Sequence, residues 1–201
     1  MNILGISGKK QAGKNTAANY IHGVVLKQSS MIEDFDIDER GRLVIKTSVE
    51  GDVEHGVLDV TRKDSAFIEY AHYNMWPHVK LYSFADGLKR LCIEFFGLSH
   101  EQGYGTEKDK NTPTKVDWED IPTWKNSSLN KNRGAMTARE LLQYFGTDVM
   151  RKMYNNVWVD HALSTIKSEK SSLAVIADVR FPNEVQAIKD AGGKVIRLTR
   201  E

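Results

Sequence analysis

The residues best suited to chemistry lie near the N-terminus, where positions 8–16 read GKKQAGKNT. Gly8 and Gly13 enclose four residues and Lys14 follows directly, which is the spacing of a phosphate-binding loop, or P-loop. Glycines let successive backbone N–H groups curl around an anion, and the lysine adds a full charge to the partial charge of a helix start. The alternative is a strand-to-helix turn without a ligand. The spacing predicts a cradle for the polyphosphate of ATP, formed by Gly8, Lys10, Ala12, Gly13, Lys14, Asn15 and Thr16.

Asn15 departs from the usual pattern, because Ser or Thr at that position normally offers a hydroxyl to Mg²⁺. An amide oxygen is a weaker ligand, and Mg²⁺ keeps several of its waters in protein sites. We therefore expect phosphates and water to hold most of the metal, and Thr16 to contact an α- or β-phosphate. This arrangement favours a nucleotide or metabolite kinase over a regulatory GTPase.

A second candidate lies far along the chain, where an apolar run beginning at position 173 ends in Asp178. An acidic residue at the end of a buried strand can act on Mg²⁺ directly or through water in P-loop proteins. Asp178 is therefore the predicted metal residue, and the alternative is an ordinary strand end. Arg180 could pair with Asp178 or Glu184, or it could reach the nucleotide.

The elements that position these residues follow from the apolar pattern, because short apolar runs indicate buried strands and spacings of three and four indicate helices. Strands alternating with helices predict an α/β protein, a P-loop three-layer fold with a central parallel sheet in one domain, residues 1–201. The expected strands are 2–7, 78–85, 173–178 and 194–199, and the expected helices are 14–26, 64–75, 86–96, 137–154, 157–167 and 182–191.

Two segments stand apart from this alternation. Residues 31–63 alternate apolar and polar side chains on both sides of positions 39–41, which predicts a small β-hairpin insertion. Residues 100–135 carry few aliphatic side chains, which is typical of disorder or of a mobile active-site cover. With the helix that follows, residues 100–155 form the predicted lid and acceptor segment.

Composition limits the possible partners. The 28 Lys and Arg residues balance 27 Asp and Glu residues, which argues against a broad nucleic-acid-binding surface. The only cysteine, Cys92, lies in an apolar helical pattern and favours a reducing compartment such as the cytoplasm. No signal peptide and no run of about 20 apolar residues is evident, so a membrane location is not expected. The pattern leaves a homodimer open.

Three further blocks carry a family resemblance. They are positions 83–89 (SFADGLK), positions 136–147 (MTARELLQYFGT) with Arg151 and Trp158 beyond, and positions 178–184 (DVRFPNE). Together with the P-loop, and in this order, they resemble the phage-type deoxynucleoside monophosphate kinases over nearly the whole chain. The resemblance implies transfer of the γ-phosphoryl group of ATP to a dNMP, with Mg²⁺, in the host cytoplasm if a phage encodes the chain. The rivals are kinases resembling dephospho-coenzyme A kinase or phosphomevalonate kinase, and a nucleotide-binding regulatory protein.

The same resemblance implies roles for residues outside the P-loop. Arg139 would contact the transferred phosphoryl group, and Asp178 and Arg180 would lie near phosphate and metal. In an α-helix, residues four apart share one face, so Arg139, Gln143, Thr147 and Arg151 would form a polar face, toward either the substrate or solvent. Trp158 could stack on the base or simply belong to the core. The expected substrate-binding residues are Asp86, Lys89, Arg139, Gln143, Gly146, Thr147 and Trp158.

Two departures from the family pattern bear on mechanism. The family usually has Asp where Asn15 stands, but a phosphate acceptor with a second pKa of about 6 needs no general base at neutral pH. Alignment and charge neutralisation then suffice, and the predicted catalytic residues are Lys14, Asn15, Arg139 and Arg151. The sequence also ends at Glu201, directly after a strand, whereas relatives continue. We therefore expect the adenine pocket to be partly missing or built differently.

Overall fold

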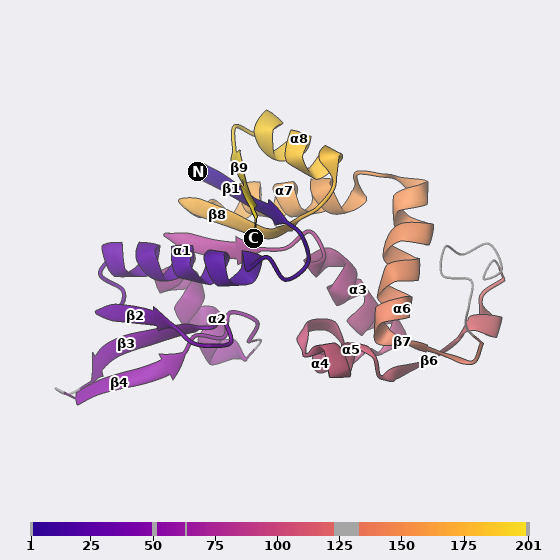
Figure 1. Cartoon of the computed structure of the whole chain (residues 1–201), viewed down its shortest axis with the longest axis horizontal. Helices are drawn as coiled ribbons and strands as arrows, with labels where there is room; N and C mark the ends of the chain where they lie inside the picture. Colours follow the sequence, from indigo (N-terminus) through magenta and orange to yellow (C-terminus); the bar gives the residue numbers. More distant parts are fainter. Residues whose placement is uncertain (1, 50–51, 63, 123–132, 200–201) are drawn as a thin grey trace. The chain divides into compact units, whose positions relative to one another are not determined.

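The computed structural model describes residues 2–49, 52–62, 64–122 and 133–199. The chain divides into two compact units, the first formed by residues 1–83 and 162–201 and the second by residues 84–161 (Figure 1). Each unit has its own buried core, and each is described by itself below.

A parallel sheet forms the centre of the first unit, as the alternation of strands and helices predicts. Its strand order is β5-β8-β1-β9, and every neighbouring pair is parallel. The register pairs Leu173 with both Asn2 and Val79, so three strands begin level with one another. The strands are β1 (Asn2–Gly8), β5 (Val79–Tyr82), β8 (Leu173–Val179) and β9 (Lys194–Leu198).

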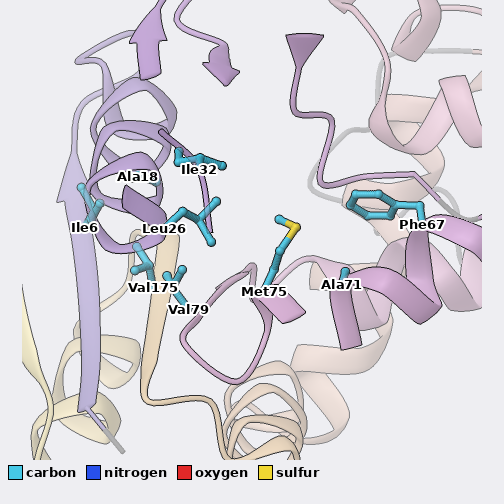
Figure 2. Close-up of a cluster of buried hydrophobic side chains, with 9 residues drawn as sticks. All are labelled: Ile6, Ala18, Leu26, Ile32, Phe67, Ala71, Met75, Val79 and Val175. Atoms are coloured by element: carbon cyan, nitrogen blue, oxygen red, sulfur yellow. The ribbon is translucent and has the colours of Figure 1, made fainter. Parts of the chain in front are cut away.

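Helices cover both faces of this sheet. Helix α1 (Lys14–Gln28) packs against β5 and β8, whereas α8 (Pro182–Asp190) packs against β1 and β9 on the opposite face (Figure 1). The connection that contains α1 runs from β1 toward β5, whereas the connection that contains α8 runs in the opposite direction, from β8 to β9. Because both crossovers are right-handed, the two helices lie on opposite faces of the sheet. Figure 2 shows the core between α1, the sheet and the helix before β5, with Ile6, Ala18, Leu26, Ile32, Phe67, Ala71, Met75, Val79 and Val175.

The insertion between α1 and β5 is larger than the predicted hairpin. The hairpin itself is confirmed, with β2 (Asp34–Ile37) antiparallel to β3 (Leu43–Val49), but a third strand, β4 (Asp52–Val57), extends it into a sheet. This sheet packs on the side of α1 that faces away from the central sheet (Figure 1). A Cβ at Gly23 would lie 2.4 Å from Phe35, so glycine permits the close approach. Helix α2 (Ser65–Tyr70) and a π-helical turn, η1 (Ala71–Met75), then lead to β5.

The second unit contains the predicted lid segment, and its described part is folded, so the disordered alternative is wrong there. Ser99 and Thr106 each cap a short helix through a reciprocal capping box. Trp118 and Met136 are fully buried between these elements, beside Cys92. Residues 123–132 lie outside the described residues. The elements are α3 (Asp86–Phe96), α4 (His100–Tyr104), α5 (Glu107–Lys110), β6 (Pro113–Asp117), η2 (Trp118–Asp120), β7 (Ala135–Thr137), α6 (Ala138–Gln143) and η4 (Tyr144–Arg151).

The predicted single helix over 137–154 has two different geometries. It begins at a capping box formed by Thr137 and Glu140, as predicted, but α6 passes into the π-helix η4 at Tyr144. Hydrogen bonds from residue i to i+5 widen the turn, but residues four apart still lie close to one face of the helix. The polar face of Arg139, Gln143, Thr147 and Arg151 therefore stays a prediction. Helix α7 (Val157–Glu169) follows and continues from the second unit into the first.

The buried His22, in the middle of α1, should make the stability of the protein depend on pH. Its side chain is 1% exposed, and neither ring nitrogen has a hydrogen-bond partner among the described residues. Burial lowers the pKa of His22 to about 4, so the unfolded chain binds a proton at pH 5 that the folded protein does not. We expect this residue alone to lower the unfolding free energy by about 2 kcal/mol between pH 7 and pH 5.

Denaturant unfolding of His22→Leu at pH 7 and pH 5 checks this expectation. The fall in unfolding free energy between the two pH values should be smaller in His22→Leu than in the wild type by that amount. His55→Ala is the matched control, since it removes an exposed histidine from β4 and should keep the loss. An unchanged pH dependence in His22→Leu would show that protonation of this ring does not limit stability.

Candidate active site

The loop between β1 and α1 has the backbone geometry of an anion cradle. Gly8 has φ +151° and Gly13 has φ +84°, both in the region that favours glycine, and Gln11 is left-handed at φ +64°. A Cβ at Gly8 would lie 2.8 Å from the Leu198 carbonyl oxygen on β9. No side chain caps the start of α1, and its first turn contains no acidic residue. The N–H groups of that turn can therefore bind an anion.

Charged side chains gather over this loop. The Lys14 Nζ donates hydrogen bonds to the carbonyl oxygens of Gly8 at 2.8 Å and Lys9 at 2.7 Å. Burial lowers the pKa of Lys14, the neighbouring Arg180 charge lowers it further, and Asp178 opposes both. Two cations and one carboxylate thus come together from the P-loop and the end of β8, as the sequence predicts for Lys14, Asp178 and Arg180.

Asp178 has a partner that the sequence analysis did not assign. The Ser83 Oγ donates a 2.6 Å hydrogen bond to Asp178 Oδ2. Ser83 directly follows β5, and Asp178 is the penultimate residue of the adjacent parallel strand β8, and ligand sites of such sheets lie at the carboxyl ends of the strands. This common edge is the signal that could have identified Ser83.

These groups suit Mg²⁺ carried by a nucleotide. Among the residues that the structure describes, no cluster of three or more His, Cys, Asp or Glu side chains could hold a metal ion. Mg²⁺ commonly binds through one or two carboxylates, water and substrate phosphates. Asp178, oriented by Ser83, offers one such carboxylate next to the phosphate loop, so the residues fit the ion.

The end of β8 continues into a tightly capped helix. The buried Glu184 accepts hydrogen bonds from the backbone N–H groups of Arg180 at 2.7 Å and Phe181 at 3.0 Å. The carboxylate of Glu184 therefore caps α8 and binds the backbone, not the guanidinium, of Arg180 in these contacts. This cap places the exposed Arg180 where its charge reaches Lys14.

A cavity of about 330 Å³ opens beside the P-loop. It is formed by residues 9–12 of the loop and by Arg197, Leu198 and Thr199 at the end of β9. Its volume lies at the lower end of the range typical of small-molecule pockets. The last described residues of the chain thus contribute directly to the surroundings of the loop.

In the second unit, two predicted substrate-binding residues lie around a tyrosine that the sequence analysis did not single out. The Lys89 Nζ lies 4.3 Å from the centre of the Tyr104 ring, a cation–π contact. The Tyr104 hydroxyl donates a hydrogen bond to Asp86, and burial raises the pKa of Tyr104 to about 12. The His100 ring stacks on the Tyr104 ring, with 4.9 Å between the two ring centres. Tyr104 therefore orders both Asp86 and Lys89.

Arg139 is held by the described part of the lid. Its Nη2 donates to Glu107 at 2.8 Å and its Nε donates to Asn111 at 3.1 Å. The ion pair with Glu107 is partly exposed on both sides, so a phosphate group could compete for the guanidinium.

The remaining predicted residues of the second unit differ in exposure. Gln143 and Thr147 are exposed and Arg151 is half-buried. Trp158 is 4% exposed, and its Nε1 donates a 3.1 Å hydrogen bond to the Gly146 carbonyl oxygen. A Cβ at Gly146 would lie 2.5 Å from Leu88, so α3 packs closely on η4 there. This gives Trp158 and Gly146 a structural role, and their contact with a base stays a prediction.

The predicted site residues thus form two groups. The P-loop residues, Asp178 and Arg180 belong to the first unit, where charge and backbone geometry bring them together. The second unit holds the predicted acceptor and lid residues, namely Asp86, Lys89, Arg139, Gln143, Gly146, Thr147, Arg151 and Trp158.

Comparison with known proteins gives two findings. The sequence model of a family described as "Deoxynucleotide monophosphate kinase" matches residues 2–201. A protein of Acanthamoeba polyphaga mimivirus named "Putative deoxynucleotide monophosphate kinase" is 35% identical over 130 residues, which are 59% of this chain and 59% of the viral protein. The match thus spans about three fifths of that relative. Among the described residues, no helix is long and apolar enough to cross a membrane.

Proposed function

The chain belongs to the deoxynucleotide monophosphate kinase family, and we propose that it transfers the γ-phosphoryl group of ATP to a deoxynucleoside monophosphate, giving a dNDP and ADP. One observation carries the proposal: the uncapped start of α1 follows a glycine loop on which Lys14, Arg180 and Asp178 converge. The family match covers the whole described chain, and so it includes both units. We therefore treat residues 1–201 as one kinase domain.

The first unit binds the donor. The N–H groups of the loop and of the first turn of α1 surround the β- and γ-phosphates, and the dipole of the helix favours their charge. The Lys14 ammonium exchanges its bonds to the Gly8 and Lys9 carbonyls for phosphate oxygens. Arg180 adds a second cation, and the cavity beside residues 9–12 and 197–199 takes the nucleoside of ATP.

Mg²⁺ would supply positive charge that offsets the charge of the donor phosphates. Asp178 would hold the ion directly or through water, and Ser83 fixes the orientation of the Asp178 carboxylate. Asn15 contributes an amide oxygen beside the phosphates, and Thr16 contacts an α- or β-phosphate. The loop and β8 thus prepare the donor phosphate without an all-protein metal site.

The second unit binds the acceptor. Its phosphate is largely ionised at neutral pH, so the protein must align it and screen its charge rather than remove a proton. Arg139 and Arg151 supply this screening, and Lys89, held over Tyr104, adds a fixed cation. Gln143, Thr147 and the Gly146–Trp158 pair surround the nucleoside, and Asp86 completes the site. The buried Cys92 accords with a reducing, cytoplasmic location.

The decisive experiment measures ADP formation from Mg·ATP with each dNMP and NMP offered separately, beside dephospho-coenzyme A and phosphomevalonate. We expect turnover with at least one dNMP and none with the two non-nucleotide acceptors. ATP hydrolysis that no acceptor accelerates would contradict the proposal and favour a regulatory nucleotide-binding protein.

Asp178→Asn tests the metal role. The amide keeps the shape of the carboxylate but lacks its charge, so we expect the Mg²⁺ concentration that gives half-maximal rate to rise by about 10- to 100-fold. Titration of Mg²⁺ at saturating ATP measures this shift. Asp190→Asn, at the exposed end of α8, is the matched control, and an equal Mg²⁺ requirement in both variants would remove Asp178 from the site.

A further inference from the structure

The turn of the inserted hairpin lies against the start of the P-loop helix. Thr16 is the third residue of α1, directly after Lys14 and Asn15. A Cβ placed on Gly41, in the β2–β3 turn, would lie 2.3 Å from Thr16 Oγ1. The Asn19 Nδ2, one turn further along α1, donates a 2.8 Å hydrogen bond to the Gly41 carbonyl oxygen. The hairpin turn lies beneath the N-terminal half of α1 (Figure 1), so it contacts the helix beside the phosphate loop.

The turn itself is firmly built. The Asp38 Oδ1 accepts hydrogen bonds from the N–H groups of Arg40 at 2.9 Å and Arg42 at 2.8 Å, and its Oδ2 accepts one from the Arg42 guanidinium at 2.7 Å. The Gly41 N–H donates to the Asp38 carbonyl oxygen at 2.8 Å. One carboxylate thus fixes the path of residues 38–42 and the position of Gly41.

The insertion is also fixed to the same helix further along. Gly23 allows Phe35 of β2 and Leu43 of β3 to pack directly on α1, with a Cβ at 23 lying 2.7 Å or less from Phe35 ring atoms. Phe35 and Leu43 lie on the two strands that the turn joins. The turn and the start of α1 therefore belong to one packed body.

Two independent features favour glycine at position 41. Its φ of +76° lies in the left-handed region, and any side chain would displace Thr16. The first reason would apply to any turn. The second concerns Thr16, the residue that contacts a phosphate of ATP under the proposed function.

We propose that residues 38–42 are a working part of the nucleotide site, in which Gly41 and Asn19 hold the Thr16 hydroxyl in place for a polyphosphate oxygen. Gly41 and Asn19 are positioning residues and touch no substrate themselves. The inserted sheet thereby sets the affinity for the nucleoside triphosphate. This inference rests on the proposed function, since it requires Thr16 to bind the phosphates of ATP.

Gly41→Ala tests the inference against two matched glycines. Gly192 has φ +78° and no atom within 4 Å of an added Cβ, so Gly192→Ala reproduces the backbone strain away from the loop. Gly56→Ala, in the same insertion, has neither the strain nor a contact. Calorimetric titration with Mg·ATP should show a dissociation constant raised about tenfold or more in Gly41→Ala. The two controls should stay within about twofold of the wild type, and the melting temperature should fall at least as far in Gly41→Ala as in Gly192→Ala.

A double-mutant cycle separates a specific contact from general loosening. In a Thr16→Ala background the added methyl at 41 no longer meets the hydroxyl, so Gly41→Ala should change ATP affinity by less than about twofold. Persistence of the full loss in that background would overturn the inference, as would equal effects of Gly41→Ala and Gly192→Ala, or unchanged ATP affinity in Thr16→Ala.

If Gly41→Ala does not fold, a second variant tests the same inference. Asn19→Ala removes only the hydrogen bond to the Gly41 carbonyl, and we expect it to raise the dissociation constant of Mg·ATP about threefold without changing that of the Thr16→Ala protein. An unchanged dissociation constant in Asn19→Ala would also count against the inference. Absence of ATP binding by the wild type is a different outcome, because it refutes the proposed function itself.

Discussion

Lys14→Ala is expected to lower kcat/KM for ATP by at least about 10³-fold, the loss typical of removing a fixed charge from the transferring phosphoryl group. The Lys14 ammonium is already positioned over the loop by the Gly8 and Lys9 carbonyls. It can therefore bind phosphate oxygens with little reorganisation. Steady-state kinetics with a dNMP that the wild type accepts, together with calorimetric titration of ATP, measure the loss.

A cation elsewhere on the same helix provides the comparison. Lys27, in the last turn of α1, pairs with Asp34 at the surface, so Lys27→Ala should keep kcat/KM within about twofold. A melting temperature of Lys14→Ala close to that of the wild type would show that the loop remains folded. If Lys14→Ala retained a tenth or more of wild-type kcat/KM, phosphate binding by this loop would no longer explain catalysis.

The donor half of the site could be predicted from the sequence because its determinants are local. Nine consecutive residues contain the glycines, Lys14 and the start of a helix, and a short, mostly apolar strand precedes them. The family resemblance implied that Asp178 lies near the loop. The order β5-β8-β1-β9 agrees with this, since β8 pairs directly with β1.

Contacts between distant segments could not be predicted in this way. Ser83 and Asp178 are 95 positions apart, and Asn19 and Gly41 are 22 apart, so neither pair produces a local pattern. The change from α6 to the π-helix at Tyr144 was equally hidden. Within the π-helix, Gly146 packs against Leu88 and accepts the Trp158 hydrogen bond. Both contacts depend on the tertiary fold, so no local residue pattern reveals them.

The lid segment shows why composition alone misleads. Its polar residues suggested disorder or a mobile cover, but Thr106 and Asp109, and Ser99 just before the segment, bind backbone N–H groups of short helices. The buried Trp118 packs in the core beneath them, together with Cys92 and Met136. Each such cap typically contributes about 1 kcal/mol to the stability of its helix, so polar side chains can favour an ordered segment.

Arg139→Ala is expected to lower kcat by about 10²- to 10⁴-fold, because its guanidinium would neutralise charge on the transferred phosphoryl group. The bonds to Glu107 and Asn111 hold the side chain against the lid. The ion pair is partly exposed on both sides, and such pairs contribute at most about 1 kcal/mol to stability. A loss of kcat with little change in melting temperature would therefore reflect chemistry.

Glu107→Gln separates the two roles of this ion pair, because it weakens the pair from the other side and leaves the guanidinium in place. If Arg139 acts on the phosphoryl group, Glu107→Gln should keep kcat within about twofold, since release from Glu107 leaves the cation available to the substrate. Single-turnover measurements on both variants decide the matter. An equal fall of kcat in Glu107→Gln and Arg139→Ala would mean that the ion pair organises the lid and that another group, with Arg151 the first candidate, neutralises the phosphoryl charge.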